Sequence, residues 1–282
     1  MELLHAVDGD LLECPVWDVA DGSLLFVDMR RPALHRLGWD DGSLATFGRG
    51  TEVSAVLPAV RSGLVVAERS VVTLGVGEPM VPAGDLVLGE PGVRFNDAAC
   101  DAVGRLFIGT MADDARPNAG RLYRLEPDLS WTTVLNDLTI SNGLGWSPDD
   151  RRMYFVDSAT RRVDVFDYDL ATGTMTDRRP FVDTSSAAGI PDGLAVDADG
   201  CVWVAFYRGQ GVRRFAPDGR LLEVLTTPVP RPTSVCFAGP NLDVLVITTR
   251  REEAGPEARP CGAHLYAHQT TTSGVPMAAF GG

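Results

Sequence analysis

The chain has 282 residues, of which 45% are hydrophobic and 22% are charged, a composition typical of a globular protein. Its formal net charge of −13 argues against nucleic acid or an anionic membrane as a partner, because both need a basic protein surface. The opening residues lack the basic start and apolar stretch of a signal peptide, and no apolar run approaches the length of a membrane span. We therefore expect a cytoplasmic protein, whose oligomeric state the sequence leaves open.

Six segments in chain order each join a turn to an apolar strand. They begin at Asp18, Ala59, Asp101, Ser147, Asp197 and Ala238. Several are followed by a third alternating strand, as in ALHRLGWD and RVDVFDYD. The spacing of about forty to fifty residues is typical of a four-stranded propeller blade. The sequence thus predicts an all-β fold, a single six-bladed β-propeller domain over residues 1–282. The N-terminal ELLHAVD would supply the outer strand of the last blade and close the ring.

Each repeat also carries a side-chain oxygen about five residues before its segment begins. These ring positions are Glu13, Ser54, Asn96, Asn142, Asp192 and, in the last repeat, Thr233 or Ser234. Asn-Gly and Asp-Gly are common turn dipeptides, so each residue alone also fits a structural role. The first strand of a propeller blade lines the central channel, however, and equivalent positions in successive blades form one ring. Their shared position in the repeat therefore favours a common site on the axis.

The chemistry of this ring points to a metal. Glu13 and Asp192 bring two negative charges into a confined channel, where they repel each other unless a cation lies between them. Oxygen ligands without histidine suit Ca²⁺, Mg²⁺ or Mn²⁺ more than a structural Zn²⁺ site. We predict a central metal site that holds one divalent cation, Ca²⁺, Mn²⁺, Mg²⁺ or Zn²⁺.

Several motifs resemble one family over essentially the whole chain. They include ECPVWD, RFNDAACDAVGRLFIGTM, ISNGLGWSPDDRRMYFVDS and IPDGLAVDADGCVWVAFY, in this order. Together they resemble the senescence marker protein/gluconolactonase/regucalcin family. The resemblance implies a six-bladed propeller with one divalent metal in its channel, and hydrolysis of a sugar lactone. It also implies that Glu13, Asn142 and Asp192 are the metal ligands.

The same resemblance implies the substrate contacts. Asn96 would lie beside the metal and touch substrate or a bound water, and Arg94 would hold substrate oxygens with its fork of donors. GTMADD places Asp114 where family members tend to have Glu in a longer loop. Asp192 is the candidate general base as well as a ligand, because its second carboxylate oxygen can take a proton.

Three functions stay open at this stage. The first is a metal-dependent lactonase acting on a small-molecule sugar lactone. The second is a metal-dependent hydrolase of another lactone or ester, which the departure at Asp114 allows. The third is a calcium-binding or ligand-binding propeller without turnover. Arg94 beside Asn96 favours an enzyme, because a site that only binds a cation has no use for a second positive charge nearby.

Overall fold

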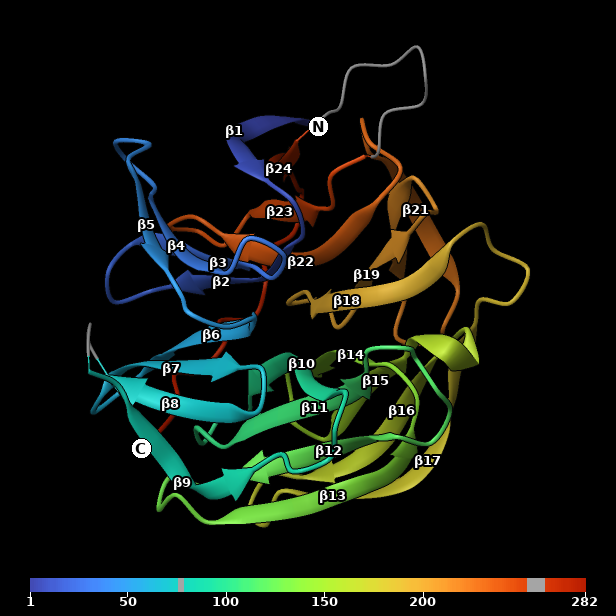
Figure 1. Ribbon diagram of the computed structural model, residues 1–282. Coiled ribbons are helices and arrows are strands. Elements are labelled where there is room, and N and C mark those ends of the chain that lie inside the picture. Colours follow the sequence, from blue (N-terminus) through green and yellow to red (C-terminus); the bar gives the residue numbers. More distant parts are fainter. Residues whose placement is uncertain (76–78, 253–261) are drawn as a thin grey trace.

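The computed structural model describes residues 1–75, 79–252 and 262–282. These residues form six four-stranded antiparallel sheets, arranged as blades around a central axis (Figure 1). The prediction of an all-β, six-bladed propeller is confirmed. Within the described ranges, the helical structure is one 3-10 turn at Ser158–Thr160, and no helix is long and apolar enough to cross a bilayer.

Each blade runs outward from an inner strand that contacts the inner strands of the neighbouring blades. The inner strands are β2 (Leu12–Asp18), β6 (Val53–Ala59), β10 (Val93–Cys100), β14 (Ser141–Trp146), β18 (Ile190–Val196) and β22 (Pro232–Ala238). The second strands are β3 (Ser23–Asp28), β7 (Gly63–Glu68), β11 (Leu106–Ala112), β15 (Arg152–Asp157), β19 (Val202–Tyr207) and β23 (Val244–Thr249). The third strands are β4 (Ala33–Gly38), β8 (Val71–Gly75), β12 (Gly120–Leu125), β16 (Arg162–Asp169), β20 (Gly211–Phe215) and β24 (Ala263–Gln269).

The outer strands include one from the start of the chain. They are β5 (Leu44–Gly48), β9 (Val81–Val87), β13 (Trp131–Leu138), β17 (Thr174–Asp183), β21 (Leu221–Thr226) and β1 (Glu2–Gly9). β1 pairs antiparallel with β24, with Leu3 opposite Tyr266, as the sequence predicted. The pairing covers what would otherwise be an open sheet edge. A second link closes the ring on the inside, where Thr233 donates its hydroxyl proton to the carbonyl oxygen of Leu12 at 2.6 Å.

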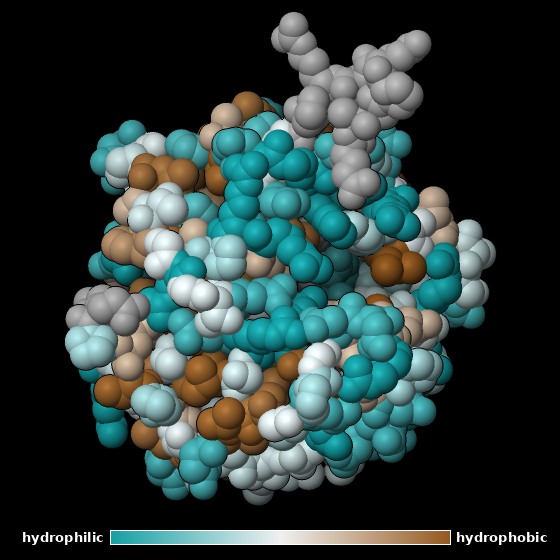
Figure 2. Space-filling view, viewed as in Figure 1, coloured by the Kyte–Doolittle hydropathy of each residue, from teal (hydrophilic) through white to brown (hydrophobic). Residues whose placement is uncertain are grey.

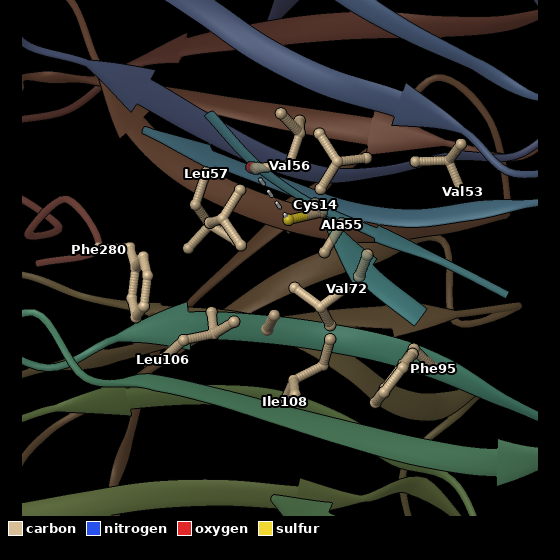
Figure 3. Close-up of a cluster of buried hydrophobic side chains, with 14 of the residues drawn as sticks. Cys14, Val53, Ala55, Val56, Leu57, Val72, Phe95, Leu106, Ile108 and Phe280 are labelled. Atoms are coloured by element: carbon tan, nitrogen blue, oxygen red, sulfur yellow. Dashed lines mark hydrogen bonds between the residues drawn. The ribbon is translucent and has the colours of Figure 1, made fainter. Parts of the chain in front are cut away.

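The hydrophobic core lies between the blades. All six residues of β3 are buried, whereas four of the five residues of β5 are exposed. The cluster of Figure 3 joins Cys14 of the first blade, Val56 and Leu57 of the second and Ile108 of the third, and Phe280 belongs to it from the C-terminal segment. Figure 2 shows hydrophilic residues in the middle of the viewed face and scattered hydrophobic ones toward its edge. Burial between blades is therefore the main stabilising term of the fold.

Two equivalent aspartates fix the backbone at the start of two inner strands. Asp28 ends β3 and accepts the N–H of Leu11 at 3.2 Å, while Asp157 ends β15 and accepts the N–H of Ile140 at 2.9 Å. Each donating residue lies two residues before a ring position. The FVD sequence that ends both second strands therefore sets the backbone at two of the predicted metal ligands.

The C-terminal segment, residues 273–282, ties several blades together at one end of the inner strands. The N–H of Val275 bonds to the carbonyl of Val196 at 3.3 Å, and the N–H of Phe280 bonds to the carbonyl of Pro58 at 2.8 Å. The segment thus joins the fifth blade to the second.

Buried thiols and a cavity lie at this same end of the molecule. Cys100 and Cys236 line a cavity of about 160 Å³ together with residues 275–278 of the C-terminal segment. None of the predicted ring residues lines it, so it is separate from the candidate site. The four cysteines in the described part of the chain are buried and free, and Cys261 lies outside the described residues.

Candidate functional site

Every inner strand has an irregular register at its ring position. The pairing of β2 with β3 shifts between Glu13 and Val16. The other inner strands shift between Val53 and Ala55, Phe95 and Ala98, Ser141 and Leu144, Pro191 and Leu194, and Pro232 and Val235. A β-bulge bends a strand and re-aims its side chains. Six equivalent bulges therefore turn the ring residues away from the regular pleat of their own sheets.

Ring residues from different blades contact one another. Asn96 of β10 donates from Nδ2 to Oδ1 of Asn142 on β14 at 2.7 Å. Two other ring positions are used by the fold itself: Ser54 donates to the carbonyl of Ala67 in its own blade at 3.4 Å, and Thr233 makes the ring-closing bond described above. Ser54 and Thr233 therefore serve the fold, whereas Asn96 and Asn142 contact each other between blades.

The carboxylates of the cluster influence one another. Burial raises the pKa of Glu13 well above its usual range, and the nearby Asp192 and Asp97 raise it further. Burial likewise raises the pKa of Asp192, with a further increase from Asp97. Arg94 lowers both pKa values but does not cancel the effect. Carboxylates from the first, third and fifth blades therefore share one electrostatic environment.

Asp97 is the carboxylate that sequence reasoning missed. Burial raises its pKa to about 6, and it acts on both Glu13 and Asp192. The repeat points to one residue per blade, whereas a bulge can direct two consecutive residues out of the pleat. The available signal was the acidic residue after Asn96 in RFND, at the place where the two following repeats have glycine.

Those two glycines explain the Asn-Gly and Asp-Gly pairs of the repeats. A Cβ atom at Gly143 would lie 2.6 Å from the backbone nitrogen of Leu194, and one at Gly193 would lie 2.1 Å from Oγ of Ser234. Neighbouring inner strands therefore approach so closely that only glycine fits beside Asn142 and Asp192.

Arg94 provides a positive charge at the edge of the cluster. Arg94 is 7% exposed, and its Nη1 donates to Asn96 Oδ1 at 2.7 Å. Its Nε lies 3.8 Å from carboxylate oxygens of both Glu52 and Asp113. Burial lowers the pKa of Arg94, but an arginine keeps its charge at neutral pH. The guanidinium is thus held in place by side chains from two blades.

The two aspartates of GTMADD have different partners. Asp113 is the member close to Arg94, and it also pairs with Arg69. Asp114 is exposed and pairs with Arg116 at 3.2 Å, which lowers the pKa of Asp114 through hydrogen bonds and charge. The contact of Asp114 with substrate stays a prediction, and Asp113 is a second candidate that the sequence did not single out.

The donor set fits a divalent cation. Among the described residues, no three His, Cys, Asp or Glu side chains by themselves form a group that could hold a metal ion. A cation here therefore needs the amide oxygen of Asn142 beside the carboxylates of Glu13 and Asp192, a mixture that hard cations accept. The mutual repulsion of those carboxylates is the feature that such a cation would relieve.

Known proteins are similar to this chain in sequence and fold. Residues 11–251 match the family described as SMP-30/Gluconolactonase/LRE-like region. The chain is 37% identical to a regucalcin of Danio rerio over 244 residues, which cover 84% of this chain and 82% of that protein. The structure of a calcium-binding protein, regucalcin, from Agrobacterium tumefaciens has a TM-score of 0.90 at 26% identity and covers 99% of this chain and 96% of its own. A luciferin-regenerating enzyme has a TM-score of 0.85 at 30% identity, with 97% and 94% covered.

Proposed function

The chain belongs to the SMP-30/gluconolactonase/LRE-like family, and from this premise we propose that it is a divalent-metal-dependent lactonase that hydrolyses a sugar-type lactone to the hydroxy acid. The observation that carries the proposal is the buried Arg94, linked through Asn96 to a cluster of carboxylates and amides. A guanidinium weakens a site that only binds a cation. It strengthens a site that also holds substrate oxygens, because it presents several fixed donors.

Glu13, Asn142 and Asp192 would hold the cation, with Ca²⁺, Mn²⁺, Mg²⁺ and Zn²⁺ as the candidates. When bound, such a cation polarises a carbonyl group and makes a bound water a better nucleophile at neutral pH. The remaining work falls to side chains of this chain.

Those side chains orient the substrate and move the proton. Arg94 donates to ring or hydroxyl oxygens, and the second lone pair of Asn96 Oδ1 can accept from a substrate hydroxyl or a water. Asp192 takes the proton of the attacking water. The water oxygen bonds to the lactone carbonyl carbon, the ester C–O bond breaks, and Asp192 returns the proton to the released ring oxygen. Asp114 at the rim would reach a substrate hydroxyl.

Proton release tests the proposal directly. Chelator-treated protein is assayed on γ- and δ-lactones and on simple esters, and again after addition of each candidate cation. Turnover of a sugar lactone that returns with metal supports the lactonase. Turnover confined to other lactones or esters supports the second function that the exposed Asp114 leaves open.

Similarity to a protein described as calcium-binding gives weight to a propeller without turnover. Tight cation binding with no hydrolysis of any compound in the panel would favour that function over ours. On our proposal the partner is a small-molecule lactone in the cytoplasm, and neither nucleic acid nor a membrane takes part.

A further inference from the structure

A continuous series of hydrogen bonds crosses the candidate site from the third blade to the fifth. Arg94 donates from Nη1 to Asn96 Oδ1 at 2.7 Å, and Asn96 donates from Nδ2 to Asn142 Oδ1 at 2.7 Å. Asn142 then donates from Nδ2 to Ser158 Oγ at 2.8 Å. Ser158 donates its hydroxyl proton to the carbonyl oxygen of Pro191 at 2.7 Å. Four side chains are thus connected in series to the backbone of β18.

The two ends of this series dictate its direction. A guanidinium can only donate and a backbone carbonyl can only accept. Because Ser158 gives its single proton to Pro191, its oxygen must accept from Asn142. An asparagine amide has two orientations of nearly the same shape, and its hydrogen-bond partners decide between them. Here the nitrogen of Asn142 faces Ser158 and its oxygen faces Asn96.

The fold does not require the hydroxyl of Ser158. The backbone N–H of Ser158 bonds to the carbonyl of Ile140 at 3.0 Å. In the first blade the N–H of Met29 makes the equivalent bond to Leu11 at 2.9 Å, without any hydroxyl. The Ser158 side chain is fully buried, and within the described chain its hydrogen bonds go to Asn142 and Pro191. Its chemistry is therefore directed at the candidate site.

We propose that Ser158 is a positioning residue, which fixes the amide of Asn142 so that its oxygen, and not its nitrogen, is presented to a divalent cation. The inference rests on the proposed function, in which Asn142 is a metal ligand. Asn96 occupies one of the two lone pairs of Asn142 Oδ1 and leaves the other for the cation. A reversed amide would direct its N–H groups at the cation, and these cannot ligate it.

Calorimetric titration of Ca²⁺ and Mn²⁺ into chelator-treated protein tests this role through affinity alone. Ser158→Ala should weaken binding about 10- to 100-fold, the usual effect of losing a partner that orients a metal ligand. The matched control is Ser141→Ala. It removes a fully buried hydroxyl beside Asn142 that has no hydrogen-bond partner among the described residues, and should leave the affinity unchanged.

The second pair of variants separates orientation from general structural damage. A carboxylate has two equivalent oxygens, so Asn142→Asp needs no partner to choose between them. Adding Ser158→Ala to Asn142→Asp should therefore change cation affinity less than about threefold. An equal loss in both backgrounds, or no loss from Ser158→Ala alone, would overturn the inference. If the unmodified protein binds neither cation, the proposed function fails first and the inference fails with it. Thermal unfolding without metal verifies that each variant folds.

Discussion

At the residue scale, Asp192 is buried and Glu13 is half-buried, and their charges oppose each other. Asp192→Asn keeps the shape of the side chain and removes part of this repulsion. We expect the metal-free variant to unfold at a higher temperature than the metal-free parent, by about 2–4 °C for each kcal/mol of repulsion removed. The same variant should lose the stabilisation that added Ca²⁺ gives the parent, because a ligand is missing. Thermal unfolding with and without chelator measures both effects.

A matched control for this prediction is Asp218→Asn. Asp218 is exposed and accepts the N–H of Arg220 at 3.0 Å within a surface turn. The Asp218→Asn variant should leave both the metal-free stability and the Ca²⁺-dependent increase in unfolding temperature unchanged. A variant at Asp192 that keeps the full increase would remove Asp192 from the metal site.

Arg94 allows substrate binding to be separated from metal binding. Arg94→Gln removes a charged donor while leaving Glu13, Asn142 and Asp192 in place. A hydrogen bond to a charged group contributes about 1.5–3 kcal/mol, so kcat/KM for the preferred lactone should fall about 10- to 150-fold. Calcium affinity should not fall, because the positive charge that is removed repels the cation. Steady-state kinetics and calorimetry on Arg94→Gln and on the surface control Arg220→Gln provide the comparison, and an unchanged kcat/KM would exclude Arg94 from the site.

At the element scale, the bulged inner strands depend on close contact between blades. In Gly143→Ala the new methyl group would lie 2.6 Å from the nitrogen of Leu194 and 2.7 Å from the carbonyl oxygen of Asp192. Backbone atoms cannot move aside without shifting the strand, so we expect a loss of about 1–3 kcal/mol in the free energy of unfolding. The metal-binding residues on both sides would shift as well, and Ca²⁺ affinity should fall.

Gly48→Ala is the control for this effect, because its Cβ atom would meet no atom of the described residues within 4 Å. Denaturant unfolding of the two variants, with Ca²⁺ titration of each, distinguishes crowding from a general effect of replacing glycine in a strand. Similar stabilities for the two variants would contradict the close approach of β14 and β18.

The elements also show what the sequence could and could not predict. In each of the six blades the inner and second strands repeat a turn and an apolar run. The number of blades and the ring positions could therefore be predicted from the sequence. The outer strands face solvent on much of their surface, as β5 does, and carry no comparable signal. Asp97 could not be predicted because the equivalent positions of the two following repeats are glycines. Ser158 could not be predicted because it lies in a turn after β15, outside the repeated segment. Both depend on contacts between blades, which sequence spacing does not record.

At the scale of the whole molecule, the site exists because the ring is closed. Glu13 and Asp192 are distant along the chain, and only the circular order of the blades brings their charges together. Closure in turn depends on β1 in the last blade and on the C-terminal segment that ties blades at the opposite end. Loss of a contact between blades should therefore lower the free energy of unfolding. The proposed metal ligands should keep their positions while the ring stays closed.

Phe280 tests this separation between the scaffold and the site. Its side chain is fully buried in the cluster shared by the first three blades, and removal of such a ring costs about 3–5 kcal/mol. Phe280→Ala should lower the unfolding temperature on the order of 10 °C in a chain of this length. Val60→Ala, at a residue that is 72% exposed, should change the unfolding temperature little. Because Phe280 lies away from the ring positions, the Ca²⁺-dependent increase in unfolding temperature should persist in Phe280→Ala. A loss of that increase in a folded variant would mean that the C-terminal segment and the channel cluster are coupled more tightly than their separate contacts indicate.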